Sequence, residues 1–203
     1  MTRVVVIDYG MGNLHSVGKA LEAVSSSDEI LISDDNKIIK SADKIVLPGV
    51  GSIRDCMAAF SLELRDVVLE EIKLKPTLAI CVGMQMLLKS SEENGGVEGL
   101  DILDGNITKI NSSKDIKVPH MGWNTVKYLR NHNLLKDIPD ESSFYFVHSY
   151  CCLESENAIT ETDHGTSFIS ALGKDNIFAV QFHPEKSQEV GLRLYKNFLD
   201  WSI

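Results

Sequence analysis

Four short apolar runs, separated by polar and glycine-rich segments, dominate the first 80 residues of the chain. They span residues 3–8, 29–33, 44–47 and 77–80. The runs are mostly continuous rather than alternating, as is typical of strands buried on both faces of a parallel sheet. Apolar residues at helical spacing predict helices at 14–24, at 54–73 with a break near Ser61, and at 84–89.

After residue 90 the pattern changes to short alternating runs between turn-rich segments, which predicts antiparallel strands that extend or flank the sheet. These strands are expected at 105–110, 116–119, 123–128, 144–150 and 167–172. An apolar run follows at 177–182, and a helix is expected at 188–201. The order of elements predicts an α/β fold, with a doubly wound, mixed, mostly parallel sheet. No repeat or linker interrupts it, so residues 1–203 are expected to form one domain.

The composition narrows the class of protein. Hydrophobic residues make up 43% of the chain, and 20 Lys and Arg against 29 Asp and Glu give a net charge of −9. This acidic balance argues against non-specific binding to nucleic acid or to an anionic membrane. No apolar run has the length of a membrane span, and the one near the N-terminus is too short for a signal peptide. Four cysteines, of which Cys151 and Cys152 are adjacent, favour reduced thiols and a cytoplasmic location.

The strand expected at 77–80 leads directly into a helix through a tight turn that contains Cys81 and Gly83. This layout is typical of a nucleophile elbow, in which the reactive side chain stands on a sharp strand-to-helix turn. Such a turn directs the first N–H groups of the helix at the reacting atoms and needs a small residue just after it. Taken alone, Cys81 is more often a small buried hydrophobic residue than a nucleophile, so its interpretation depends on the rest of the chain.

Two glycine-rich loops follow predicted strands. The Pro-Gly-Val-Gly loop at 48–51 lies at the carboxyl end of its strand, where open α/β sheets bind ligands. Its backbone N–H groups can face an anion or an oxyanion, although a plain turn is an equal alternative. The loop at 8–13 lacks the glycine spacing of a dinucleotide site and is predicted to be a structural turn unless other residues give it a role.

His183 and Glu185 follow the last apolar run. Pro184 favours an extended backbone at His183, and side chains two residues apart on an extended chain point the same way. A carboxylate beside an imidazole fixes its tautomer and lets it move a proton to or from a cysteine. Together with Cys81 these residues form the parts of a Cys–His–Glu triad. Four further histidines, His120, His132, His148 and His164, lack the spacing of a metal site, so no metal is expected.

With these residues identified, the chain resembles the class I, triad-type glutamine amidotransferases, and more narrowly the glutaminase subunits of imidazole glycerol phosphate synthase. The matching stretches are 8–13, 48–51, 81–85, 118–124, 145–150 and 181–187, which run along nearly the whole chain. The elbow and the His-Pro-Glu sequence are typical of the superfamily. Tyr-Gly-Met-Gly-Asn at 9–13 and Pro-His-Met-Gly-Trp-Asn at 119–124 narrow the resemblance to this type of glutaminase.

The resemblance implies a role for each matching position. Cys81 is expected to be the nucleophile, His183 the general base and acid, and Glu185 its orienting carboxylate. The implied oxyanion hole consists of Gly49, Val50, Gly51 and Val82. The implied glutamine pocket consists of Gln85, His148, Ser149 and Tyr150. The implied partner interface consists of Asn13, Met121, Trp123 and Lys186.

The resemblance further implies a flavodoxin-like fold, no cofactor, and a heterodimer with a (β/α)8-barrel cyclase. This partner receives ammonia through a channel and forms imidazole glycerol phosphate and AICAR in histidine biosynthesis. Three alternatives stay open at this point. One is a glutaminase that serves another synthase, such as one that amidates surface sugars, and another is a non-catalytic docking protein, which the complete triad disfavours. The third is a protease- or chaperone-like relative, which often has histidine where Val82 stands.

Overall fold

The centre of the molecule is a run of parallel strands with the hydrophobic core on both of their faces. A computed structural model describes residues 2–203. The parallel strands, in their order across the sheet, are β2 (Glu29–Ser33), β1 (Arg3–Ile7), β3 (Lys44–Gly49), β4 (Thr77–Cys81) and β13 (Ile177–Val180). Residues Val4 to Ile7 of β1 are all 0% exposed, which explains why these runs are continuous rather than alternating.

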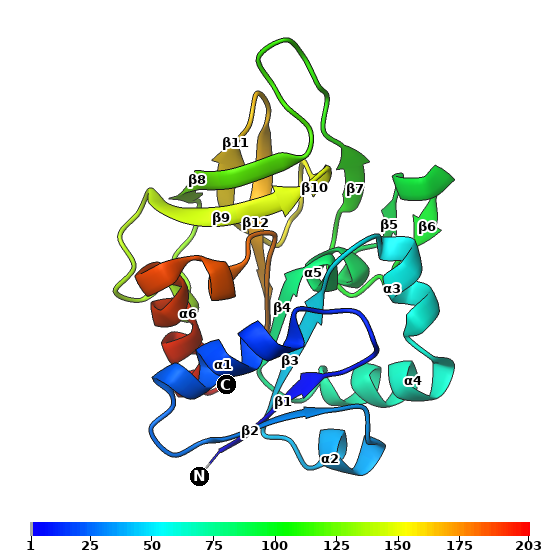
Figure 1. Cartoon of the computed structure of the whole chain (residues 1–203), viewed down its shortest axis with the longest axis vertical. Coiled ribbons are helices and arrows are strands. Elements are labelled where there is room, and N and C mark those ends of the chain that lie inside the picture. Colours follow the sequence, from blue (N-terminus) through cyan, green and yellow to red (C-terminus); the bar gives the residue numbers. More distant parts are fainter. Residues whose placement is uncertain (1) are drawn as a thin grey trace.

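The sheet continues beyond β13 with mainly antiparallel strands. In order, these are β12 (Ser167–Lys174), β10 (Tyr150–Cys152), β7 (Asn106–Lys109), β5 (Ser90–Ser91) and β6 (Val97–Glu98). A branch leads from β12 through β11 (Ala158–Asp163) and β8 (His120–Tyr128) to β9 (Ser142–His148). Figure 1 shows β8, β9 and β11 as a curved layer above α6. The α/β fold with a mixed sheet is therefore confirmed.

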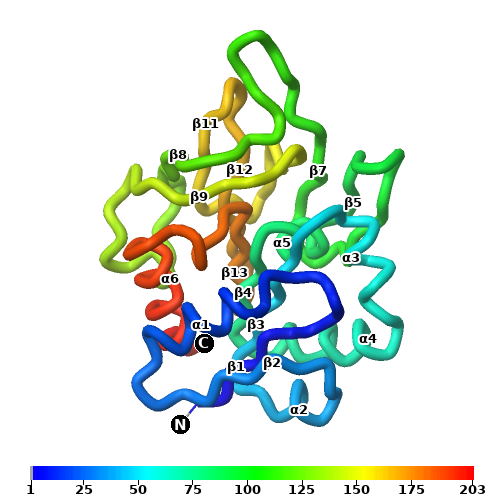
Figure 2. Tube along the Cα trace, in the orientation of Figure 1, coloured from blue at the N-terminus to red at the C-terminus, as the bar shows by residue number. Residues whose placement is uncertain are grey.

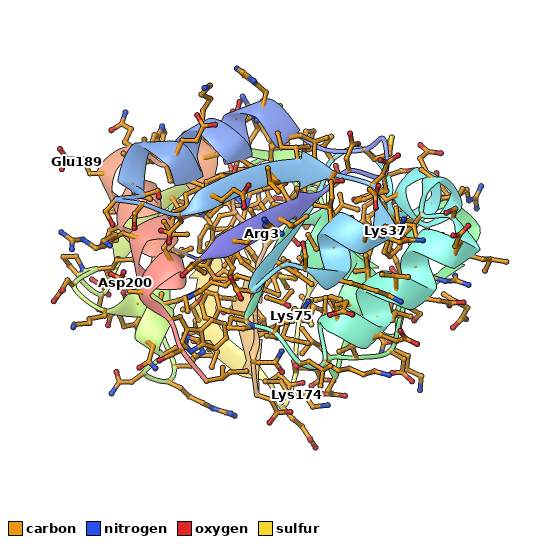
Figure 3. The ribbon with its side chains drawn as sticks, turned by 90° about the horizontal axis from the view of Figure 1, so that it is seen from below. Arg3, Lys37, Lys75, Lys174, Glu189 and Asp200 are labelled. Atoms are coloured by element: carbon orange, nitrogen blue, oxygen red, sulfur yellow. The ribbon has the colours of Figure 1, made fainter. Side chains whose placement is uncertain are left out.

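Helices cover both faces of the parallel strands. On one face α1 (Leu14–Val24) contacts α6 (Gln188–Asp200), as the trace in Figure 2 shows. The other helices are α2 (Asn36–Lys40), α3 (Ile53–Ala59), α4 (Leu62–Glu71) and α5 (Val82–Leu87), with short 3-10 turns η1 (Glu93–Gly95), η2 (Asn133–Leu135) and η3 (Pro184–Lys186). In Figure 3 the strand that carries Arg3 runs between α1 and α6 on one side and α2 and α4 on the other. No helix within residues 2–203 is long and apolar enough to cross a membrane.

Most predicted elements are present, and the differences have local causes. The helix expected at 54–73 is broken where Ser61 caps α4 by accepting a hydrogen bond from the N–H of Leu64 at 3.4 Å. The strand expected at 116–119 was a wrong prediction. Ser113 closes a turn with Ile116 there, and Pro119 has no N–H to donate to a neighbouring strand. Helix α2 and strands β5, β6 and β11 were not predicted.

Lys44, at the start of β3, holds the C-terminal end of α6. Its ammonium is buried and donates hydrogen bonds to the carbonyl oxygens of Phe198 at 2.9 Å, Leu199 at 2.7 Å and Trp201. Burial lowers the pKa of this lysine, while nearby carboxylates of Asp28 and Asp200 act in the opposite direction. The contact joins the parallel sheet to the last helix. It is favourable because the positive charge of the lysine lies at the negative end of the helix dipole.

Replacing Lys44 with methionine is expected to lower the free energy of unfolding by roughly 2–3 kcal/mol, because it leaves buried carbonyl groups without a donor. Urea unfolding followed by circular dichroism measures the change. Lys40→Met, which alters an exposed lysine of α2, is the matched control and should change stability by less than about 0.5 kcal/mol. Equal stability of the two variants would show that the Lys44 contacts do not hold the helix end.

Candidate active site

Cys81 is the last residue of β4, and α5 begins at the next residue. Strand β4 lies between β3 and β13, with Cys81 in register with Gly49. The backbone of Cys81 has φ 54° and ψ −109°, a conformation that a non-glycine residue adopts only where its surroundings impose it. Its side chain is nearly buried, at 4% exposure. The geometry is that of the strand-to-helix elbow predicted from the sequence.

Two glycines allow the elbow to lie this close to β3. A Cβ atom on Gly83 would lie 2.0 Å from the carbonyl oxygen of Leu47, and one on Gly49 would lie 2.6 Å from the backbone nitrogen of Gly83. Both distances are far below van der Waals contact, and the atoms involved are backbone atoms that cannot turn away. Only glycine therefore fits at these two positions. The missing side chains allow the 48–51 loop to pack directly against the first turn of α5.

His183 and Glu185 form a buried pair at the end of the neighbouring strand. The Nδ1 atom of His183 lies 2.8 Å from Oε1 of Glu185, and the two side chains are 3% and 1% exposed. His183 has an extended backbone, and its N–H donates to the carbonyl of Tyr145 at 2.8 Å. Glu185, however, lies in the 3-10 turn η3 and not on an extended chain. The turn after Pro184, rather than strand alternation, brings the carboxylate back to the imidazole.

The pKa of His183 is raised to about 10. Burial by itself lowers this pKa, but negative charge on Cys81 and hydrogen bonding and charge at Glu185 together outweigh the burial. The Nε2 atom of His183 is buried and has no hydrogen-bond partner among the described residues. The raised pKa favours a protonated ring when the Cys81 sulfur is negatively charged, and the protonated ring can then stabilise that charge.

A cavity of about 360 Å³ opens beside the Cys81 sulfur. Ten residues predicted for the site line it, namely Val50, Gly51, Cys81, Val82, Gln85, His148, Ser149, Tyr150, His183 and Lys186. Glu93, Pro119 and Val147 complete the lining. Residues from far apart in the sequence thus converge at the carboxyl end of the parallel strands, where open α/β sheets bind their ligands.

Apart from Glu185, four predicted residues lie outside this lining. Gly49 packs against the first turn of α5, and Asn13 donates to Oε1 of Glu185 at 3.4 Å. Met121 and Trp123 lie on β8 and are 63% and 49% exposed. Asn13 is half-buried, and its side chain contacts the carboxylate of the His–Glu pair.

Gln181 is a site residue that the sequence did not single out. Its Nε2 donates to the Cys81 sulfur at 3.6 Å, and its Oε1 accepts from Nε2 of Gln85 at 2.9 Å. It directly follows β13 and lies two residues before His183, so the i, i+2 spacing of an extended chain was a signal that could have identified it. Glu93 was also missed. Its Oε2 accepts from the N–H of Ile53 at 2.9 Å, and nothing in its turn-rich segment indicates this position.

The loop at 48–51 is anchored from below by two side chains. The buried Tyr9 hydroxyl donates to the carbonyl of Pro48 at 2.6 Å, and the Cys56 thiol donates to the carbonyl of Val50 at 3.3 Å. Burial raises the pKa of Tyr9, so it stays a protonated donor. The 8–13 loop therefore has more than the turn-forming role expected of it, because it supports the second glycine-rich loop.

Three of the four histidines that are scattered in the sequence meet in space. The ring of His120 stacks on that of His164, with centroids 4.0 Å apart, and its Nδ1 lies 2.9 Å from Nε2 of His148. Burial, together with the neighbouring histidines, lowers the pKa of His120 to about 3. Burial likewise lowers the pKa of His148 to about 4. Within residues 2–203 no group of three potential ligands is arranged to hold a metal ion.

These depressed pKa values predict a loss of stability in acid. Between the ordinary histidine pKa of 6.5 and the folded values of about 3 and 4, the unfolded chain binds more protons than the folded protein. Stability from the neutral histidines is therefore complete above about pH 6.5 and is lost as the pH falls toward the folded-state values.

The contribution of His120 to this pH dependence can be isolated by mutation. His120→Asn should reduce the slope of unfolding free energy against pH by about 1.4 kcal/mol per pH unit between pH 6 and pH 4, since one proton is no longer taken up on unfolding. Urea titrations of both proteins across this range measure the slope. Identical slopes would mean that His120 is not held neutral in the folded protein.

Comparison with known proteins agrees with this geometry. A model of the class-I glutamine amidotransferase family matches residues 5–201. The imidazole glycerol phosphate synthase subunit HisH of Acinetobacter baylyi is 50% identical over 208 residues, which cover 100% of both chains. The HisH subunit of Nitrosococcus oceani is 50% identical over 206 residues, covering 100% of this chain and 99% of its own.

Solved structures share the fold at lower identity. PurLQS from Thermotoga maritima has a TM-score of 0.72 at 19% identity, with 98% of this chain and 99% of that chain covered. A glutamine amidotransferase from Thermotoga maritima has a TM-score of 0.61 at 16% identity, with 98% and 83% covered. The chain therefore belongs to the class-I glutamine amidotransferase family, and it is similar over its full length to HisH subunits of imidazole glycerol phosphate synthase.

Proposed function

We propose that the chain is the glutaminase subunit of an imidazole glycerol phosphate synthase. It hydrolyses glutamine to glutamate and ammonia. The ammonia passes to a (β/α)8-barrel cyclase, which forms imidazole glycerol phosphate and AICAR in histidine biosynthesis. The observation that carries the proposal is that Cys81 and His183 line one cavity, with Glu185 bonded to the far side of the His183 ring. Full-length similarity to HisH subunits supports the choice of acceptor enzyme.

In the proposed reaction the Cys81 sulfur attacks the side-chain carboxamide carbon of glutamine and forms a tetrahedral intermediate. His183 protonates the departing nitrogen, ammonia leaves, and a thioester remains. Water activated by His183 then hydrolyses the thioester and releases glutamate. Glu185 acts through the 2.8 Å contact with Nδ1, which orients the ring and stabilises its protonated form.

The oxyanion of the intermediate is proposed to be held by backbone N–H groups of Val82 and of the Gly49–Gly51 segment. Losing one such donor raises the barrier by roughly 3–4 kcal/mol. Tyr9 and Cys56 anchor the carbonyls of Pro48 and Val50, which limits where this segment can turn. A peptide that turns an N–H into the hole only when the partner is bound would restrict hydrolysis to conditions in which ammonia can be used.

The proposed cyclase-binding surface adjoins the cavity at Lys186, which also lines the cavity. Trp123 packs edge-on against Tyr145, with ring centroids 6.1 Å apart, and the Lys186 ammonium lies 5.6 Å from the centroid of the same Tyr145 ring. Met121 is exposed on the same strand as Trp123. Large exposed apolar side chains next to a cation are typical of a protein interface, which supports a partner here.

Residues 1–203 are proposed to act as one domain in the cytoplasm. The hydrophobic core is one cluster that includes the parallel strands and, from β8 and β9, Val126, Phe144 and Phe146. All four cysteines are free thiols. A reducing compartment keeps such thiols available, including the proposed nucleophile.

Covalent labelling tests the proposal. A glutamine-like electrophile such as 6-diazo-5-oxo-L-norleucine, added to the complex with the cyclase, is expected to modify Cys81 alone. Peptide mass spectrometry identifies the modified residue, and excess glutamine should slow the reaction. Labelling of Cys56, Cys151 or Cys152 in preference to Cys81 would contradict the assignment. A labelling rate that does not change when excess glutamine is added would also contradict it.

A further inference from the structure

A continuous line of hydrogen bonds connects strand β8 to the proposed glutamine pocket. The side-chain nitrogen of Asn124 lies 3.1 Å from Nε2 of His120, and Nδ1 of His120 lies 2.9 Å from Nε2 of His148. Nδ1 of His148 lies 2.9 Å from the carbonyl oxygen of Tyr150. We call these three side chains, Asn124, His120 and His148, the β8 relay. The two rings are only 4% and 6% exposed, so water does not compete for these contacts.

The groups at the two ends of the β8 relay determine which atom donates and which accepts in each of its hydrogen bonds. The Asn124 amide nitrogen also lies 2.8 Å from the carbonyl oxygen of Asp163, and its Oδ1 accepts from the N–H of Thr125 at 2.8 Å, so the amide orientation is fixed. The amide must then donate to Nε2 of His120. His120 must donate from Nδ1 to Nε2 of His148, and His148 must donate from Nδ1 to the Tyr150 carbonyl. Both rings are neutral and carry their single proton on Nδ1.

The Tyr150 carbonyl links the β8 relay to the nucleophile. The same oxygen accepts from Nε2 of Gln85 at 3.2 Å, and Gln85 in turn contacts Gln181, which donates to the Cys81 sulfur. Tyr150 and His148 both line the cavity beside Cys81. A shift of the 148–150 segment would therefore change the cavity wall and the partners of Gln85 together.

The other end of the β8 relay lies on the strand that carries the proposed partner surface. His120 and Asn124 point inward from β8, whereas Met121 and Trp123 point outward and are exposed. His120 pairs directly with His148 of β9 across the ladder. The relay thus starts at residues whose neighbours face the proposed partner and ends at the wall of the proposed pocket.

We propose that His120 is a positioning residue for glutamine binding, through which strand β8 sets the place of His148 and of the Tyr150 carbonyl. The inference rests on the proposed glutaminase function and adds a residue that does not itself line the cavity. Its donor at Nδ1 holds His148 in the tautomer that bonds Tyr150. Its acceptor at Nε2 ties that arrangement to Asn124.

Three substitutions of His120 separate positioning from packing. Asn places an amide donor near the Nδ1 position, Gln places an acceptor near the Nε2 position, and Leu provides neither. Steady-state glutamate release is measured in the complex with the cyclase. His120→Gln and His120→Leu should raise KM for glutamine about tenfold and leave kcat within about threefold. His120→Asn should keep KM within about threefold of the wild type, because the donor to His148 is retained.

His132→Asn is the matched control. His132 is also a partly buried neutral histidine, stacked on Phe178 with ring centroids 4.4 Å apart, but it lies outside the β8 relay. Asn can replace its capping bond to the N–H of Leu134. This variant should leave KM unchanged. A KM unaltered in His120→Leu, or raised equally by His132→Asn, would overturn the inference.

Ring-nitrogen NMR distinguishes failure of the inference from failure of the proposed function. Long-range 1H–15N spectra of the wild-type protein should show both His120 and His148 neutral at pH 7 with the proton on Nδ1. A proton on Nε2 of either ring would overturn the inference whether or not the protein hydrolyses glutamine. A wild-type complex with the expected tautomers but no glutamate release would contradict the proposed function instead.

Discussion

Replacing Cys81 with alanine is expected to abolish glutamate release by the complex, with a loss of at least about 10⁴-fold in kcat. The Cys81 sulfur is the only nucleophile at the elbow, and without it the remaining groups can only polarise a bound amide. The fold should persist, because removing one buried sulfur leaves a small cavity and relaxes no backbone contact. Glutamate measured by a coupled assay and complex formation measured by gel filtration report the two properties separately.

Cys152→Ala is the matched control, since Cys152 is also fully buried but does not line the cavity. It should retain glutamate release within a few fold of the wild type and bind the partner equally. Substantial hydrolysis by Cys81→Ala, with Cys152→Ala unaffected, would mean that the nucleophile has been assigned wrongly. Loss of activity in both variants would point to disrupted packing instead of lost chemistry.

Replacing Gly83 with alanine is expected to destabilise the protein by roughly 4 kcal/mol or more, a large part of the stability of an ordinary domain. The added methyl would lie 2.0 Å from the carbonyl oxygen of Leu47. Helix α5 or strand β3 must move to relieve this overlap, and either movement displaces the elbow. Urea unfolding and the rate of Cys81 labelling by the glutamine-like electrophile should both show the damage.

Gly18→Ala is the corresponding control. A Cβ at Gly18 meets only the end of the Ile32 side chain at 3.3 Å, and alanine is favoured inside a helix such as α1. Its stability should stay within about 1 kcal/mol of the wild type. If Gly83→Ala unfolded at the same urea concentration as this control, close packing of the elbow against β3 would not be what requires glycine.

The parallel part of the fold could be predicted because its signals are local. Continuous apolar runs identified β1, β3 and β4, and their burial on both faces is the reason that these runs lack alternation. The five-residue helix α2 could not be predicted in this way. It depends on Asp35, whose carboxylate accepts from the N–H of Lys37 at 2.7 Å, and it is too short for a periodic pattern.

The candidate site was also predicted unevenly. The elbow has a local signature, and the His-Pro-Glu sequence places two ionisable groups close together along the chain. The β8 relay has none, because His120 and His148 are far apart in sequence and meet only through the pairing of β8 with β9. The same holds for the bonds from Tyr9 and Cys56 to the 48–51 loop, which depend on how the 8–13 loop and helix α3 pack against it.

The most direct test of the central claim is glutamate release from glutamine, with and without the (β/α)8-barrel cyclase from the same organism and its nucleotide substrate. The account predicts slow release by this chain on its own and strong stimulation by the loaded cyclase, since the partner is proposed to complete the oxyanion hole. Equal rates in the presence and absence of the cyclase, with Cys81 still labelled by the glutamine-like electrophile, would contradict the assignment to this synthase.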